Sequence, residues 1–546
     1  MEIRERTDEV MNHPPPLHGS NAYDGDAALV AALHREGGGW AEEKVRALGA
    51  LVMSAGFGEL AREANRHSPE LRTHDRFGRR LDRVIYHPSY HELMSLAFGH
   101  EVHSLAWTAR RPGAHVARAA LSFLWNQGEN GVGCPTGMTF GSPSALRHAP
   151  EIAEVWEGKV LSRRYDPREI AVAEKTGATV GETLTEKHCG SDLRAITTRA
   201  HPLGPADEYA LEGDKWFFSA PMSDAFFTLA RTEKGPSCFF VPRILPDGTR
   251  NRVAIQRLKG KCGNRSNASA EITFDGTWAR LIGEEGRGIR VVLEMSHLTR
   301  FDFAVGSAGL MRQALTQTLH HASHRMTFGR PLLDQPLMRN VLADLALESE
   351  AATVLTMRLA RAYDGAADSE SEQIVARLVT PVAKYWICKR TPAFVAEALE
   401  CEGGNGYIED GVMPRLYREA PLNGIWEGTG NLICLDVLRV LATPHAFEAF
   451  VNEVKAAAGG DPRLDAFLLR LAGDMGKDAG NEARARRTVE MMALALQASL
   501  LVRHSTKEVA DAFVASRLGG ETGRAFDTLS GNLAQGTIVK RALLTE

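Results

Sequence analysis

The chain has 546 residues, of which 44% are hydrophobic and 24% charged, and its formal net charge is −4. This length is too great for a single hydrophobic core and indicates about three or four domains. The composition is that of an ordinary globular protein and by itself requires neither a nucleic-acid partner nor a membrane.

The seven cysteines are scattered along the chain without a C-x-x-C pair. This pattern argues against a disulfide framework and against a structural zinc site, so we expect reduced thiols in a cytoplasmic protein and no metal. The charged N-terminus lacks the apolar segment of a secretory signal. The uncharged run from 491 to 502 is too short to span a bilayer and indicates a buried helix.

The N-terminal part is predicted to be an extended arm followed by a helical domain. Residues 1–25 contain three consecutive prolines, Pro14 to Pro16, and are expected to wrap a neighbouring subunit or to lie on the surface. Residues 26–180 carry apolar side chains at helical spacing, as in Leu93, Leu96 and Ala97.

Residues 181–287 change to short aromatic and β-branched segments that are separated by Gly, Asp and Pro. The clearest predicted strands are 209–218, 225–230, 237–242 and 270–274. Strands so close together, without helices between them, indicate an antiparallel sandwich or barrel and exclude a Rossmann unit.

Helical spacing returns at residue 288 and predicts a bundle over 288–442, followed by a C-terminal helical domain over 443–546. The predicted fold class is therefore α+β and multidomain. It comprises a helical domain, an antiparallel β domain, a helical bundle and a further helical domain.

The segment from Arg415 to Asp436 is the strongest candidate for chemistry. Glu427 lies between the aromatic Trp426 and the turn-forming Gly428, so its carboxylate stands on constrained backbone near an apolar wall, which suits a general base. The alternative is an ordinary loop glutamate before a helix that starts near Thr429.

Four other segments carry candidate ligand-binding groups, and each has a structural alternative. Small hydroxyl residues at 184–193 can donate to an anion or carbonyl, or form a polar turn. Trp216 can cover a flat cofactor ring or pack in the core. Arg325 can bind phosphate, or belong to a solvated helix end that stops at Gly329. The glycines of 402–407 permit close backbone approach, but no strand precedes them as in a dinucleotide fingerprint.

Taken together and in this order, these segments resemble the acyl-CoA dehydrogenase family of FAD flavoproteins over roughly residues 25–442. The longer arm, the segment 262–269 and the extra C-terminal domain are more similar to the AidB branch, whose members are linked to DNA alkylation damage. The resemblance implies an FAD-dependent oxidoreductase acting on an acyl-CoA, assembled as a homo-oligomer that is expected to be a tetramer.

The resemblance also assigns roles to individual residues. Glu427 matches the base that takes the α-proton of the substrate while a hydride leaves the β-carbon for the flavin. The positions matched to cofactor contacts within one subunit are Leu184, Thr185, Ser191, Trp216, Phe217, Phe218, Ser219, Trp426, Gly428, Thr429 and Asn431. Those matched to contacts with the FAD of a neighbouring subunit are Arg325, Phe328, Glu400, Gly404 and Asn405.

The sequence departs from the family pattern at two places. Phe218 stands where the family has a threonine, so a hydroxyl contact to the flavin is missing unless Ser219 replaces it. Glu400 stands in place of a glutamine, and Glu402 adds a second carboxylate near the expected phosphates. Such charges carry an electrostatic cost unless a cation such as Arg325 or Arg418 compensates.

Two functions of different classes follow. One is α,β-dehydrogenation of an acyl-CoA thioester, and the other is a DNA-binding flavoprotein that protects DNA or destroys alkylating agents. The second requires a basic face, but acids and bases are about balanced after residue 443, so a helical bundle that completes an oligomer is the alternative for this domain. Any DNA binding should be to duplex DNA without sequence preference. The candidate basic residues are Arg439, Arg484, Arg486, Arg487, Arg503, Lys507 and Arg517.

Overall fold

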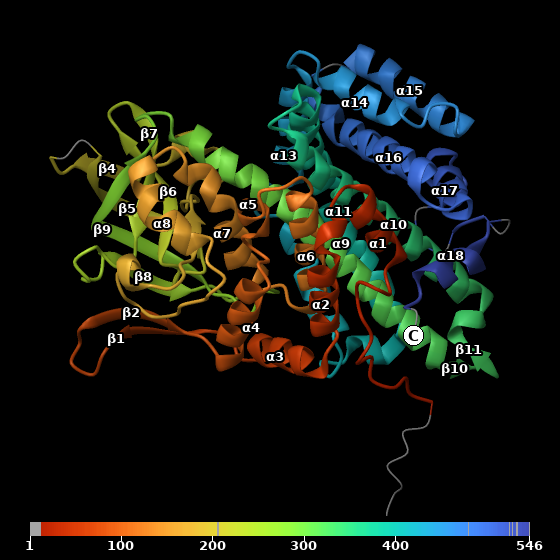
Figure 1. Cartoon of the computed structure of the whole chain (residues 1–546), viewed down its shortest axis with the longest axis horizontal. Helices are drawn as coiled ribbons and strands as arrows, with labels where there is room; N and C mark the ends of the chain where they lie inside the picture. Colours follow the sequence, from red (N-terminus) through yellow and green to blue (C-terminus); the bar gives the residue numbers. More distant parts are fainter. Residues whose placement is uncertain are drawn as a thin grey trace, which may run out of the picture.

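The computed structural model describes residues 12–204, 207–478, 480–523, 525–526, 528–530 and 533–544, with the backbone alone at 477 and 478. Helices come first, a β domain follows, and helices make up the rest of the chain (Figure 1). The predicted fold class is confirmed. Among the described residues, no helix is long and apolar enough to cross a membrane.

The described part of the N-terminal arm lies against its own chain. Asn12 forms two hydrogen bonds with the backbone of Met326, of 2.7 and 2.9 Å. His320 Nε2 lies 2.7 Å from the carbonyl oxygen of Pro15, and Tyr23 is fully buried. Residues 1–11 of the predicted arm lie outside the described residues.

The N-terminal domain is helical as predicted, with one β-hairpin that the pattern did not reveal. In the hairpin, Asp75 accepts hydrogen bonds from the backbone of Phe77 and Arg79, which closes the turn. Its strands are rich in Arg and His and therefore lack an alternating apolar face. The elements are α1 Ala27–Arg35, α2 Glu42–Val52, α3 Ala55–Arg66, β1 Glu70–His74, β2 Arg80–Ile85, α4 Pro88–Gly99, α5 Leu105–Thr108, α6 Ala114–Gly128, α7 Gly133–Leu146 and α8 Pro150–Val160.

The β domain is a seven-stranded sheet in the order β3-β6-β4-β5-β9-β7, and β8 pairs with β9. Strands β6 and β7 also pair, so the sheet closes on itself. All four predicted strands are confirmed. The sheet is not wholly antiparallel, because β6 runs parallel to both β3 and β4. The strands are β3 Val180–Thr183, β4 Arg199–Pro202, β5 Glu208–Ser219, β6 Ala225–Thr232, β7 Gly235–Pro242, β8 Val253–Leu258 and β9 Ser269–Ile282.

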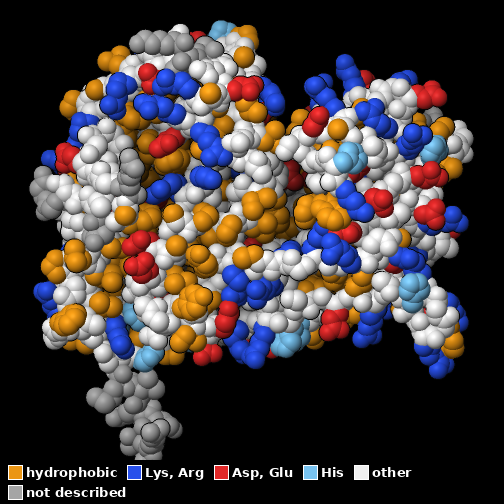
Figure 2. All heavy atoms as spheres, turned by 180° about the vertical axis from the view of Figure 1, so that it is seen from behind, with side chains coloured by type: hydrophobic (Ala, Val, Ile, Leu, Met, Phe, Trp, Pro, Cys, Tyr) orange, Lys and Arg blue, Asp and Glu red, His pale blue; other side chains and the backbone are white. Residues whose placement is uncertain are grey.

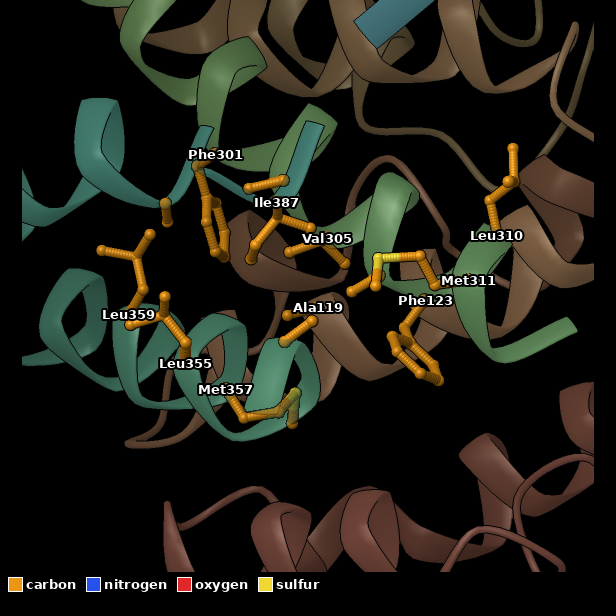
Figure 3. Close-up of a cluster of buried hydrophobic side chains, with 14 of the residues drawn as sticks. Ala119, Phe123, Phe301, Val305, Leu310, Met311, Leu355, Met357, Leu359 and Ile387 are labelled. Carbon is orange, nitrogen blue, oxygen red and sulfur yellow. The ribbon is translucent and has the colours of Figure 1, made fainter. Parts of the chain in front are cut away.

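Long helices form the bundle that follows. Figure 3 shows Phe301 and Val305 of α9 pointing toward Leu355 of α10 and Ile387 of α11, and all four are buried. Helices α9 and α11 run in the same direction because α10 returns the chain between them. A two-residue hairpin, β10 Met326–Thr327 and β11 Arg330–Pro331, separates α9 from α10. The helices are α9 Gly288–His324, α10 Pro336–Gly365, α11 Glu370–Cys401, α12 Met413–Glu419 and α13 Gly430–Leu441.

The C-terminal helices pack on the bundle and extend its core. Buried side chains of α16 belong to the same apolar cluster as those of α9, α10 and α11. Residues 491–502 lie in α16, where most of them are buried, as predicted. The helices are α14 Ala446–Lys455, α15 Pro462–Asp478, α16 Ala485–His504, α17 Lys507–Phe513 and α18 Gln535–Ala542.

Candidate active site

The backbone at Glu427 is left-handed, with a φ of +52°. Few residues other than glycine adopt this conformation, and they do so where surrounding contacts hold them in it. Arg300 Nε donates to the carbonyl oxygen of Glu427 at 2.9 Å. Lys384 Nζ donates to the carbonyl oxygens of Trp426, at 2.9 Å, and of Gly428. Two cations from α9 and α11 therefore bind three consecutive carbonyl groups and fix the loop.

These cations belong to a partly buried network. Arg300 Nη1 lies 3.3 Å from Asp436 on α13, and Arg377 donates to both oxygens of Asp436 at 2.7 and 3.0 Å. Lys384 is 1% exposed, and this burial lowers its pKa to about 8. No local sequence pattern indicates either cation, because both reach the loop from distant helices and Arg300 lies 127 residues before Glu427.

Trp426 forms the wall beside the candidate base. Its ring stacks on Phe303 of α9 with centroids 4.7 Å apart, and its Nε1 donates to Asn423 Oδ1 at 2.9 Å. A recess next to this wall has about 10 Å³ of free space, roughly enough for one water molecule. The lining is largely polar and comprises Asn126, Asn130, Gly133, Cys134, Asp302, Phe303, Gly306, Glu419, Asn423 and Trp426.

A second carboxyl group, which the sequence reasoning missed, lies beside Glu427. Glu182 on β3 is 7% exposed, and among the described residues neither of its carboxyl oxygens has a hydrogen-bond donor. Burial and the neighbouring Glu427 carboxylate raise the pKa of Glu182 well above its usual range, while Arg300 opposes the shift. Burial therefore favours the protonated form of Glu182, which lies next to the candidate base. In the sequence, Glu182 is marked only as an acidic residue within a short segment that forms a buried strand.

The structure brings together the two β-domain segments that were expected to face the flavin. The backbone N–H of Trp216 donates to the carbonyl oxygen of Thr185 at 2.8 Å, and Thr183 Oγ1 donates to that of Phe217 at 3.0 Å. Leu184 packs in the same apolar cluster as Trp426, which places these segments near the Glu427 loop. Ser191 is exposed.

Within β5, the side chains differ from the expected arrangement at Phe218. Trp216 is half-buried at the domain surface, with Lys259 Nζ 3.1 Å from its ring centroid, so it does not pack in the core. Phe217 is 51% exposed. Phe218 is instead buried against Phe226, at 4.5 Å between centroids, because the register shifts between Lys215 and Phe218. Phe218 therefore cannot contact a flavin at the surface.

Ser219 is the nearest remaining hydroxyl on this strand. Its Oγ lies 3.3 Å from Ser269 Oγ on β9, where either atom can donate. The hydroxyl is therefore partnered within the β domain and retains two further hydrogen-bonding sites.

Arg325 and Phe328 lie far from Glu427 in the same chain. The 25 residues of α9 between Arg300 and Arg325 correspond to about 37 Å of helix. Contacts between α9 and α11, at Ser307 with Cys388 and Thr318 with Ala398, show that the two helices advance together. The C-terminal end of α11 therefore lies at this same distant end, with the predicted residues Glu400, Gly404 and Asn405.

Among the described residues, this distant end exposes large side chains and open backbone. Phe328 is 99% exposed and has a φ of +49°. A Cβ atom added at Gly404 would meet no heavy atom within 4 Å. Tyr407 is 79% exposed next to it.

The expected charge compensation of Glu402 is wrong. Arg418 pairs with Glu409, and Arg325 Nη1 donates to the carbonyl oxygen of Asn12 at 2.7 Å. Burial raises the pKa of Glu402 to about 7 instead. Partial protonation therefore reduces the charge that Glu402 would present to a phosphate.

Thr429 and Asn431 lie at the N-terminus of α13, where Thr429 is the cap residue and makes no side-chain capping bond. The free N–H groups of a helix start favour an anion. Arg486 of α16 donates from Nε to Asn431 Oδ1 at 2.8 Å. A residue predicted to bind DNA therefore contacts the predicted cofactor site, so the two sites are not separate.

The other candidate DNA-binding residues do not form one open stripe. Arg503 pairs with Glu453 at 2.8 Å, and Arg517 pairs with Asp344, so both guanidinium groups already have acidic partners within the chain. Arg484 lies 4.0 Å from Asp474. Figure 2 shows Lys and Arg side chains mixed with acids over the C-terminal helices. The predicted residues that are exposed there are Arg439, Arg486, Arg487 and Lys507.

Comparison with known proteins agrees with this geometry. The Adaptive response protein AidB N-terminal domain model matches residues 12–167, and the acyl-CoA dehydrogenase middle and C-terminal domain models match 181–277 and 286–442. Over 481 residues the chain is 48% identical to the protein AidB of Escherichia coli (strain K12), covering 87% of this chain and 88% of that protein. The chain belongs to the acyl-CoA dehydrogenase family.

Solved structures of acyl-CoA dehydrogenases share the fold. ACDH-11 of Caenorhabditis elegans, in complex with C11-CoA, is 27% identical with a TM-score of 0.86, over 94% of this chain and 93% of that one. An acyl-CoA dehydrogenase from Bacillus anthracis, complexed with FAD, is 15% identical with a TM-score of 0.65, over 83% and 86% of the two chains. The second likeness concerns the fold alone.

Proposed function

We propose that this protein binds FAD and dehydrogenates an acyl-CoA thioester, with Glu427 taking the α-proton. The observation that carries the proposal is the Glu427 loop, whose left-handed backbone is clamped by Arg300 and Lys384. A base fixed in this way does not have to be ordered when the substrate binds, which lowers the barrier to proton transfer. FAD supplies the acceptor for the hydride that leaves the β-carbon.

Glu182 is proposed to stay protonated beside Glu427. Two neighbouring carboxyl groups do not both ionise readily, and burial favours the protonated form of Glu182. A protonated Glu182 adds no negative charge beside the candidate base. The buried position of Glu182 and its lack of donors support this assignment.

The cofactor is proposed to lie between two subunits. Leu184, Thr185, Trp216 and Phe217 would flank the ring system beside Glu427, and the α13 N-terminus with Thr429 and Asn431 would receive the diphosphate-bearing part. Because Arg325 and Phe328 lie about 37 Å away along α9, they would serve the FAD of another copy. We therefore propose a homo-oligomer, of which the expected tetramer is one form.

The recess beside Trp426 has about 10 Å³ of free space, which is room for one water molecule and not for an acyl group. Binding of any acyl chain there would require the Trp426 wall to move.

The test begins with the visible spectrum of the purified protein, followed by anaerobic addition of acyl-CoA thioesters from short to long chain. We expect a yellow protein whose flavin absorbance is bleached by at least one of these thioesters. A colourless protein that does not take up added FAD, or a yellow one that no acyl-CoA bleaches, would contradict the proposal.

A second candidate function is non-specific binding of duplex DNA in a response to alkylation damage. The likeness to AidB and the exposed Arg439 and Arg487 favour it. Arg487→Ala should flatten the dependence of affinity on salt by about one phosphate contact, measured by fluorescence anisotropy of a labelled duplex. Arg486→Ala is the matched variant and should also weaken FAD retention through Asn431. Equal flavin loss in both variants, or no DNA binding by the wild type at low salt, would contradict this assignment.

A further inference from the structure

A cavity of about 490 Å³ lies where the N-terminal helical domain meets the β domain. This volume is within the usual range for small-molecule sites, roughly 300–1,000 Å³. It does not coincide with the recess beside Trp426, since the two share no lining residue and lie on either side of the Cys134–Pro135 bond. The proposed dehydrogenation uses no group in this cavity.

Arg243 carries the argument for a ligand. This residue lines the cavity and is only 6% exposed. Its Nη2 lies 3.2 Å from Glu169, while Nε and Nη1 are buried and have no acceptor among the described residues. A guanidinium group so deeply buried normally has acceptors for its N–H groups. The hydroxyl of Tyr86, also in the lining, is buried near Tyr90 and the backbone of Ala268 and forms no well-aligned hydrogen bond among the described residues.

The charges around the cavity favour a monoanion. Asp166, Glu169 and Asp224 supply three negative charges. The lining also holds three arginines, since Arg168 pairs with Asp166, and Arg83 and Arg243 pair with Glu169, while Lys175 pairs with Asp224 from outside the lining. The acids and arginines of the lining are therefore balanced, and the unpaired N–H groups of Arg243 can receive one further negative charge. A phosphate monoester carries about −1.5 to −2 charges at neutral pH, and beside Glu169 and Asp224 such a group would be repelled.

Apolar side chains form much of the remaining wall. The rings of Tyr86 and Tyr90 stack at 4.0 Å between centroids, and Met94, Met222 and Pro135 also line the space. Flat aromatic and methionine surfaces suit the body of an aromatic or branched aliphatic molecule.

We propose that this cavity binds a small monocarboxylate with an apolar body. The carboxylate accepts hydrogen bonds from Arg243 and Tyr86, and the body lies against Tyr90 and Met222. The site is independent of the acyl-CoA reaction and holds whether or not that reaction occurs.

The experiment is calorimetric titration of the purified full-length protein with benzoate, benzamide and phenyl phosphate, which share one ring. We expect benzoate to bind at least about tenfold more tightly than the other two, since only benzoate offers one full negative charge to Arg243. No measurable benzoate binding, or equal binding of all three, would overturn the proposal.

Variants locate the binding. Arg243→Met should weaken benzoate at least about tenfold and Tyr86→Phe about threefold. Met222→Trp should abolish binding by filling the space. Arg79→Met, an exposed arginine on the adjacent hairpin, is the control and should bind as the wild type does. Melting curves show whether each variant is folded. If Arg243→Met is unfolded, the benzoate affinities of Tyr86→Phe and Met222→Trp test the site. Unchanged affinity in Tyr86→Phe and Met222→Trp would reject the site.

Discussion

The two ends of α9 differ in how far one chain satisfies their functional groups. At the Arg300 end, Glu427 and its neighbours are held by bonds from α9 and α11 within the same chain. At the Arg325 end, Phe328 and Tyr407 stand exposed and Gly404 faces open space. The first end is prepared for catalysis in a single subunit. The second has the exposed groups that the proposed sharing of FAD with another subunit would cover.

The largest effect on the reaction rate is expected at the Arg300 end of α9. Glu427→Gln should keep FAD but slow flavin bleaching by acyl-CoA by about 10²–10⁴-fold, because an amide of the same shape cannot accept the α-proton. Stopped-flow absorbance measures the rate. Glu182→Gln is the companion variant and should lose far less, since the group it replaces is already neutral. Similar rates for Glu427→Gln and the wild type would show that the base lies elsewhere.

Removing one cation of the clamp should have the next largest effect. Lys384→Met should lower the bleaching rate by about 10- to 100-fold, since a loop displacement of about 1 Å is costly. Its pKa of about 8 also predicts that the wild-type rate falls as pH rises through 8, when the lysine loses its charge. This decline should be absent in the variant.

The same two proteins also test how Lys384 changes the pH dependence of folding stability. Its pKa in the fold lies below the ordinary value of 10.5, so the unfolded chain binds more protons between about pH 8 and 10.5. The wild type should therefore gain stability relative to Lys384→Met as pH rises through that window. Lys389→Met, exposed on the same helix, is the control.

At the Arg325 end of α9, Arg325→Ala should weaken both FAD retention and the proposed oligomer. A lost charge-assisted contact costs roughly 1.5–3 kcal/mol. Gel filtration with a flavin absorbance trace measures both, with Arg330→Ala on the same hairpin as the control. If the variant keeps a full flavin complement in an intact oligomer, the contrast between the two ends of α9 fails.

Glu402→Gln has the smallest expected effect. The substitution should stabilise the fold, whereas the variants above are expected to impair the protein. The pKa of Glu402, about 7 in the fold against 4.5 when unfolded, means that the wild type loses stability as pH rises from 4.5 to 7. The full shift corresponds to about 3 kcal/mol, and partial solvation brings it nearer 1–2 kcal/mol.

The variant should therefore melt higher than the wild type at pH 8 and equally at pH 4. Its FAD retention at pH 8 should also rise, because a negative charge near the expected phosphates is removed. Glu400→Gln, an exposed neighbour, should show no such change in melting temperature. A higher melting temperature for Glu402→Gln that is the same at both pH values would contradict the assignment.

Much of the architecture could be predicted because local patterns determine it. Aromatic and β-branched runs marked four strands, and Trp426-Glu427-Gly428 marked the candidate base. The clamp could not be predicted, since Arg300 and Lys384 are ordinary cations within long helices and reach Glu427 only after the bundle forms. Phe218 points inward because of a register shift, and no pattern of residues in the sequence predicts this shift.

The length of α9 would also set the distance between two catalytic centres of the proposed oligomer. One residue inserted between Arg300 and Arg325 would rotate everything beyond it by about 100°. Two full turns, seven residues, would nearly restore the facing but lengthen the helix by about 10.5 Å. If the proposed oligomer forms, the number of residues in this segment is constrained by both cofactor sites at once. Homologues of altered spacing here would need a different subunit arrangement to keep their cofactor.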